Sequence, residues 1–129
     1  MTRAVFGVAV LAVLTAARPI GAADRAASVD RYSEPELLRN WALARCLSRA
    51  FPGSPLEHDA AAAAGGYLEY GKVGADAYAQ TETLVGDFLA RTYQSQSGEA
   101  LQTMKCIDLF HSPELGRLVR RYAGQRNRK

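Results

Sequence analysis

The sequence predicts an all-α protein, a compact bundle of about five helices with one disulfide. Three observations lead to this prediction. Apolar residues recur at three- and four-residue spacing from Leu37 to Tyr122, no segment alternates apolar and polar residues as a strand does, and three segments pair a serine with a nearby proline as helix starts do. The disulfide would join the only two cysteines of the chain, Cys46 and Cys106, and two free buried thiols are the alternative.

Residues 1–23 have the features of a cleaved signal peptide. Arg3 gives a cationic start, residues 4–17 carry no charge, and Gly21-Ala22-Ala23 provides the small side chains that favour cleavage after Ala23. The uncharged run is too short to cross roughly 30 Å of hydrocarbon as a helix, so a cleaved signal is favoured over a retained amphipathic anchor. We therefore expect an exported protein with one helical domain at 24–129, in a compartment where disulfides form.

The charge balance argues against a nucleic-acid partner. Arg3 and Arg18 lie in the leader, so the mature chain keeps fourteen basic and thirteen acidic residues and a net charge of about +1. The charge is uneven, because residues 24–116 carry a net −5 and six basic residues with no acid follow from Arg117 onward. We expect the last residues, Gln125–Lys129, to form a frayed tail in solvent.

The first two helices begin at capping boxes, in which a serine is followed three residues later by a glutamate. Ser33 pairs with Glu36 and Ser54 with Glu57, and a proline follows each serine at a position suited to a first helical turn. The first helix should end before Pro52-Gly53. The second should run from about Leu56 to Tyr70.

Three further helices are expected in the second half of the chain. They span about 75–93, about 99–110 and about 113–123, and the last begins at Ser112-Pro113. The polar segment Gln94-Ser95-Gln96-Ser97-Gly98 lies between the first two of these helices and should form an exposed loop.

The sequence offers no convincing catalytic or cofactor site. A nucleophilic cysteine needs a nearby base, but His111 is five residues from Cys106, more than one helical turn away, and a bridged cysteine cannot attack a substrate. A metal site would have to assemble two cysteines and two histidines, His58 and His111, from distant segments with no pair at the usual spacing of two to four residues, and no glycine-rich phosphate loop is present. We expect no enzyme, no cofactor and no metal, and we expect instead a protein that acts by binding. Four tyrosines are candidate interface anchors, with a half-buried role at the edge of the core as the alternative: Tyr67, Tyr70, Tyr78 and Tyr93.

Three longer motifs resemble the type VI secretion system amidase immunity proteins. They are Asn40–Leu47, Gly66–Gly71 and Thr103–Ser112, the last followed by Glu114-Leu115, and the similarity extends over roughly Tyr32 to Tyr122. The resemblance implies a periplasmic helical homodimer that binds a papain-like Cys-His peptidoglycan amidase and does no chemistry itself. It also implies that the motif residues hold the fold, with Trp41 and Ile107 in the core and Cys46 bridged to Cys106.

In that family inhibition is by occlusion, because a protruding loop enters the active-site cleft of the enzyme. By position and polar character, Gln94, Ser95, Gln96, Ser97 and Gly98 are the best candidates for this loop. The turn Gly71, Lys72, Val73 and Gly74 is the second choice.

Two other kinds of function stay open on the sequence. One is a periplasmic binding module, like a lysozyme inhibitor or a chaperone, with an endogenous protein ligand. The other is a secreted enzyme that uses cysteine chemistry. Membrane association after signal cleavage is not expected, because the uncharged segment leaves with the leader.

Overall fold

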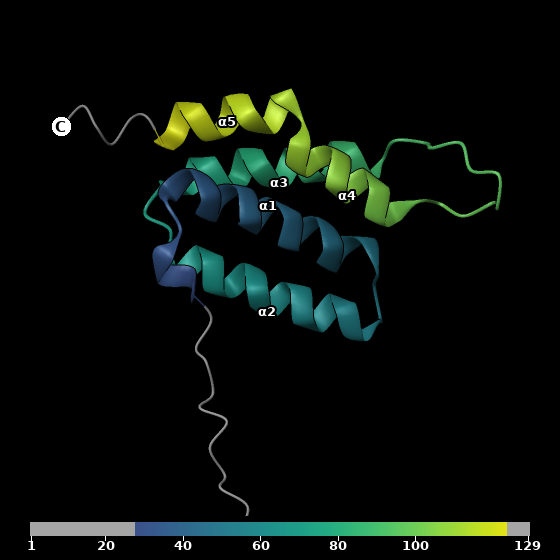
Figure 1. Ribbon diagram of the computed structural model, residues 1–129, viewed down its shortest axis with the longest axis horizontal. Coiled ribbons are helices and arrows are strands. Elements are labelled where there is room, and N and C mark those ends of the chain that lie inside the picture. The colour runs from purple at the N-terminus through teal and green to yellow at the C-terminus, as the bar shows by residue number, and fades with distance from the viewer. Residues whose placement is uncertain (1–27, 124–129) are drawn as a thin grey trace, which may run out of the picture.

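The computed structural model describes residues 28–123, which form five α-helices and one short 3-10 helix (Figure 1). In chain order the elements are η1 (Ser28–Arg31), α1 (Glu34–Ala50), α2 (Pro55–Tyr70), α3 (Ala75–Leu89), α4 (Gln102–His111) and α5 (Pro113–Ala123). No strand occurs in residues 28–123, so the all-α prediction is confirmed. The predicted signal peptide at 1–23 and the basic tail at 125–129 lie outside the described residues.

Helix α1 runs through the middle of the bundle. Helix α2 packs along one side of it, α3 and α5 lie on the other side, and α4 covers the end near the α3–α4 loop (Figure 1). The largest fully buried side chains include Leu38 of α1, Phe88 of α3, Leu109 of α4 and Leu115 of α5. Each of the four helices therefore contributes a large apolar side chain to one shared core, and burial of such side chains is the main favourable term in folding.

The predicted helix starts are confirmed by their hydrogen bonds. The backbone N–H of Ser33 donates to the Glu36 carboxylate over 2.8 Å. The Ser54 hydroxyl accepts the Glu57 N–H over 3.2 Å. The buried Ser112 hydroxyl accepts the Leu115 N–H at the start of α5 over 3.1 Å. These bonds satisfy donors that a helix leaves unpaired in its first turn, which is why three residues of local sequence sufficed to place each start.

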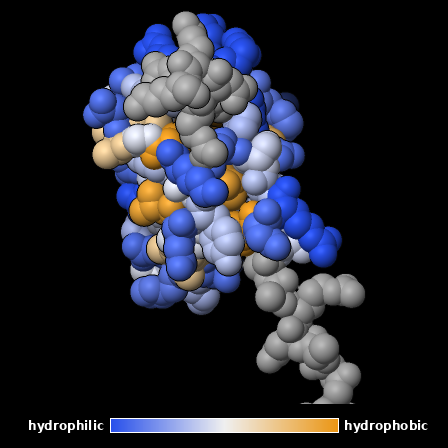
Figure 2. Space-filling view, turned by 90° about the vertical axis from the view of Figure 1, so that its left-hand side faces the viewer, coloured by the Kyte–Doolittle hydropathy of each residue, from blue (hydrophilic) through white to orange (hydrophobic). Residues whose placement is uncertain are grey.

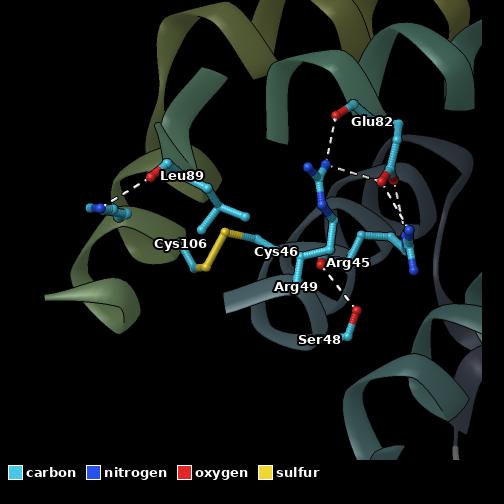
Figure 3. The surroundings of a disulfide bond; sticks show 8 residues. Arg45, Cys46, Ser48, Arg49, Glu82, Leu89 and Cys106 are labelled. Atoms are coloured by element: carbon cyan, nitrogen blue, oxygen red, sulfur yellow. Dashed lines mark hydrogen bonds and ion pairs between the residues drawn. A yellow bond between two sulfur atoms is a disulfide. The ribbon is translucent and has the colours of Figure 1, made fainter. Parts of the chain in front are cut away.

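The predicted disulfide is also confirmed. Cys46 of α1 and Cys106 of α4 are bonded, with their Cα atoms 5.5 Å apart, and both side chains are fully buried (Figure 3). The same stretch of α1 reaches α3 through two arginines. Arg45 pairs with Glu82 over 2.9 Å and Arg49 pairs with the same carboxylate over 3.1 Å. Three helices are thus joined around one turn of α1.

Helices α3 and α4 are shorter than predicted at the ends that face each other. Helix α3 stops at Leu89 instead of near Tyr93, and α4 starts at Gln102 instead of Glu99. Leu101 explains the late start, because its φ of 51° places it in the left-handed region, which a helix cannot continue through. The connecting loop is therefore twelve residues long, from 90 to 101.

The prediction that Ile107 lies in the core is wrong, whereas Trp41 is buried as predicted. Ile107 is 49% exposed and Trp41 is 7% exposed. The disulfide turns Cys106 inward, and the next residue of an α-helix is rotated by about 100° around the helix axis. The buried face of α4 therefore carries Lys105, Cys106 and Leu109, and Ile107 faces outward.

Candidate functional site

The α3–α4 loop protrudes from one end of the bundle, beyond the ends of the helices that flank it (Figure 1). Its predicted tip, Gln94–Gly98, is uncharged. All of its residues are exposed except Ser95, which is half-buried. The structure therefore places the first-choice residues, Gln94–Gly98, on a loop that projects from the bundle.

The tip satisfies part of its hydrogen bonding within itself. The hydroxyls of Ser95 and Ser97 lie 2.9 Å apart, and the Ser97 N–H donates to the Ser95 hydroxyl over 3.2 Å. The Gly98 N–H points to the Ser95 carbonyl at 3.5 Å, and Gly98 has a φ of +78°. A residue in this region of φ turns the chain back toward α4, which glycine permits without a steric penalty.

The base of the loop is fixed by side chains of α4. The Lys105 ammonium donates to the Leu89 carbonyl at the end of α3 over 3.1 Å. The Tyr93 hydroxyl donates to the Asp108 carboxylate over 2.6 Å, and this bond raises the pKa of Tyr93 because it is made by the protonated phenol. The sequence did not reveal these contacts, since a lysine and an aspartate three residues apart on a helix look like an ordinary surface pair.

The second-choice turn, Gly71–Gly74, lies at the opposite end of the bundle, between α2 and α3 (Figure 1). The Lys72 N–H donates to the Glu34 carboxylate of α1 over 2.8 Å, and the Gly71 N–H donates to the Tyr67 carbonyl over 3.1 Å. Val73 is half-buried and packs against the core. This turn is therefore held close to the body of the bundle instead of projecting from it.

Figure 2 views the end of the molecule opposite the protruding loop. Where the described residues are visible, hydrophobic residues appear there as small patches between hydrophilic ones. This end offers a partner a surface of mixed character, whereas the other end carries the polar tip of the loop together with the exposed Met104 and Ile107 of α4.

Three of the four tyrosines proposed as interface anchors have partners within the bundle. Tyr67 packs against Tyr32, with ring centroids 6.1 Å apart, and Tyr78 meets the Trp41 ring edge-on at 5.0 Å. Tyr93 is held by its bond to an α4 carboxylate. Tyr70 is 48% exposed at the end of α2 and keeps the surface position that an anchor needs.

Catalysis by a cysteine is excluded by the bonding of both sulfurs. Cys46 and Cys106 are joined to each other and buried, so neither is a thiolate that a base could activate. His111 is exposed, and its ring meets Phe110 edge-on at 5.1 Å. Within residues 28–123 no group of three or more potential ligands is placed to hold a metal ion. In the same part of the chain, no helix has the length and apolar character needed to span a membrane.

Residues 36–119 match the profile of a known family, described as "Tai4: Type VI secretion system (T6SS), amidase immunity protein". The matched segment begins in the first turn of α1, ends in α5 and includes both cysteines and the protruding loop. The chain belongs to the Tai4 family. The resemblance stated from the sequence motifs is therefore confirmed.

Solved structures support the assignment. A chain in the structure of the effector–immunity system Tae4/Tai4 from Salmonella typhimurium is 37% identical to this chain. The TM-score is 0.70, and the match covers 74% of this chain and 94% of that one. No curated protein matches the sequence.

Two more distant structures share the fold. One is the Tae4–Tai4 complex from Enterobacter cloacae, at 21% identity and a TM-score of 0.62, covering 69% of this chain and 91% of that chain. The other belongs to a study of type VI-secreted toxins and self-resistance proteins in Serratia marcescens, at 24% identity and a TM-score of 0.68, covering 88% and 98%.

Proposed function

We propose that this member of the Tai4 family is a periplasmic immunity protein that binds a type VI secreted peptidoglycan amidase and occludes its active site. The observation that carries the proposal is the family match over residues 36–119, together with 37% identity to a chain of a Tae4/Tai4 effector–immunity system. The protein has no catalytic task in this proposal. It protects the cell that makes it, and sister cells with the same gene, from an enzyme that cuts their cell wall.

The protruding loop suits occlusion of a Cys-His active site. Its tip, Gln94–Gly98, is narrow, uncharged and rich in short polar side chains. Such side chains can enter a groove and pair with its hydrogen-bonding groups, so that neither surface buries an unpaired charge. The turn Gly71–Gly74 is the less suitable plug because its backbone is bonded to α1 and α2.

The experiment uses the Tae4 amidase of Salmonella typhimurium, because the relative at 37% identity comes from that system. A variant with Gln94, Ser95, Gln96 and Ser97 all replaced by alanine should inhibit peptidoglycan hydrolysis at least about 30-fold less strongly, which is about 2 kcal/mol of binding free energy. Its melting temperature should stay close to that of the parent, because these side chains make hydrogen bonds only within the loop.

The matched control changes the other end of the molecule. A variant with Lys72→Ala and Val73→Ala should inhibit as strongly as the parent, although the loss of Val73 packing lowers its stability slightly. Inhibition that survives the loop change and fails in this control would show that Gly71–Gly74 is the plug. If neither variant weakens inhibition, occlusion must come from a helix surface.

Periplasmic action and dimer formation are parts of the same proposal. Deleting residues 1–23 should abolish protection of cells while leaving inhibition in vitro intact, because the shortened protein would stay in a different compartment from the amidase. Sedimentation equilibrium of the mature protein should give twice the mass of one chain. Protection by a version shown to remain in the cytoplasm would contradict the proposed location.

A further inference from the structure

The α3–α4 loop is long for a connection between two packed helices, so specific contacts are needed to hold it in one conformation. It spans twelve residues, from 90 to 101, whereas most helix–helix connections in bundles have two to eight. A loop of this length that moved freely would have to be ordered when a partner binds, and that ordering lowers affinity. The contacts at its base decide how much of this ordering is already present in the free protein.

The first contact fixes the point where the chain leaves α3. Lys105 is only 6% exposed, and its ammonium donates to the Leu89 carbonyl over 3.1 Å. Leu89 is the last residue of α3, where the helix dipole is negative, so a cation is favoured at this position. The same ammonium lies 6.0 Å from the centre of the Tyr93 ring.

The second contact lies four residues further along the loop. The Tyr93 hydroxyl donates to a carboxylate oxygen of Asp108 over 2.6 Å, a short bond to a charged acceptor. Lys105 and Asp108 are three residues apart on α4, so they lie on neighbouring parts of its surface. One helix therefore holds the outgoing limb of the loop at two points, Leu89 and Tyr93.

Helix α4 can serve as a fixed support because it is covalently attached to the bundle. Cys106, between Lys105 and Asp108, is bonded to Cys46 of the central helix α1 (Figure 3). Beyond Tyr93, no side-chain hydrogen bond ties the loop to α4 before the chain re-enters that helix at Gln102. This segment, residues 94–101, contains the proposed plug.

We infer that Tyr93 is a positioning residue for inhibition: its bond to Asp108 holds the plug, Gln94–Gly98, in the direction in which it enters the amidase. The inference rests on the proposed function. Tyr93 acts through Asp108 and α4, and it does not itself need to touch the enzyme. The order it imposes exists before the amidase arrives, so the complex forms without first immobilising the limb.

The test replaces Tyr93 by phenylalanine, which keeps the ring near Lys105 and removes only the hydroxyl. In the free protein, the backbone amides of residues 91–98 should lose order in ¹⁵N relaxation, with order parameters falling toward about 0.6 or below. Inhibition of Salmonella typhimurium Tae4 should weaken about fivefold, with the melting temperature unchanged. Tyr32→Phe is the matched control, because Tyr32 is exposed near the other end of the bundle and its ring can still pack against Tyr67, so it should change neither measurement.

A double-mutant cycle distinguishes positioning from direct contact. Asp108→Ala should weaken inhibition as much as Tyr93→Phe, and the double variant should be no weaker than either single one, because each change removes the same bond. Additive effects would show that Tyr93 and Asp108 act independently of their shared bond, which would overturn the inference. Unchanged order parameters in Tyr93→Phe would overturn it as well.

The two readouts also separate this inference from the proposed function. If the alanine loop variant loses inhibition but Tyr93→Phe does not, the loop is supported as the plug and the positioning role of Tyr93 is refuted. If the alanine loop variant inhibits like the parent, the plug itself is wrong. Any loss of order in Tyr93→Phe would then have no consequence for inhibition, and the positioning role would also be refuted.

Discussion

The two loops at opposite ends of the bundle are built in contrasting ways. At one end, Gln94–Gly98 projects from the molecule, and the hydrogen bonds that its polar groups make stay within the loop. At the other end, Gly71–Gly74 lies against the body, with Lys72 bonded to Glu34 of α1 and Val73 packed on the core. The loop that carries Gln94–Gly98 contacts the bundle only at its base, whereas the turn Gly71–Gly74 is packed into the fold.

This difference shows how a small helical protein can combine a stable fold with a variable recognition element. A loop that satisfies its own polar groups can change its sequence without removing contacts from the core. The turn Gly71–Gly74 has less freedom to change, because Val73 packs on the core and a side chain at Gly71 would collide with Tyr78. We therefore expect partner recognition to lie in the loop, whose side chains make few contacts with the core.

The largest expected effect comes from removing the disulfide, which anchors the end of the bundle that carries the loop. Replacing both Cys46 and Cys106 by alanine opens a loop whose ends are 60 residues apart in sequence. The free energy of unfolding should fall by about 4 kcal/mol, because the unfolded chain regains the freedom that the bridge removed. Urea denaturation of the parent and the variant measures this difference.

Reduction of the parent protein provides the control for that measurement. The reduced parent, unfolded in the presence of dithiothreitol, should be destabilised by a similar amount, although its sulfur atoms still fill the core. A loss below about 1 kcal/mol in both cases would mean that the apolar contacts of α4 hold this end without the bridge.

A matched pair of glycine substitutions tests the contrast between the loops directly. A Cβ at Gly71 would lie 2.0 Å from the Tyr78 hydroxyl oxygen, and Tyr78 is itself packed against Trp41. Gly71→Ala should therefore cost about 1–3 kcal/mol through overpacking. A Cβ at Gly98 would meet nothing within 4 Å, so Gly98→Ala should cost only about 1 kcal/mol, through its φ of +78°.

The measurement for this pair is thermal unfolding, read beside amidase inhibition. Gly71→Ala should lower the melting temperature more than Gly98→Ala but leave inhibition of the amidase intact. Gly98→Ala should lower the melting temperature less and should weaken inhibition of the amidase. The opposite order of the two melting temperatures would contradict the view that only the turn is part of the packed fold.

The smallest expected effect concerns Glu82, which lies on α3 midway between the two loops. Its carboxylate accepts two bonds of 2.9 Å from Arg45, and these bonds hold its pKa below the ordinary value for glutamate. A lowered pKa in the folded state adds stability above the ordinary pKa of about 4.3, and that stability is lost as the pH falls through the folded value. Both side chains are about one-third exposed, so solvent screens the pair and its contribution is about 1 kcal/mol.

Glu82→Gln should accordingly be less stable than the parent by about 1 kcal/mol at pH 7. The difference should shrink as the pH is lowered below about 4, because the parent then loses the same charge. Denaturation at pH 7, 5 and 3 tests this trend. A difference that stays constant over this range would mean that Glu82 stabilises α3 through packing and not through its charge.

Local sequence determined the helix starts and the helical class. Ser33, Ser54 and Ser112 each cap a helix through atoms no more than three residues away, so the signal is complete in a short window of sequence. The disulfide was predictable for a different reason, since two cysteines leave only one possible pair once export is expected. The loop Gln94–Gly98 was placed by its composition, which lacks any apolar residue to hold it in the core.

Only the tertiary structure decided how the ends of α3 and α4 meet and which face of α4 is buried. Ile107 was misplaced because the inward face of a short helix depends on its partner, here the bond from Cys106 to α1. The end of α3 at Leu89 and the position of Tyr93 depend on Lys105 and Asp108, which lie fifteen or sixteen residues further along the chain. Contacts across such distances leave no local pattern, because they exist only once the helices have packed.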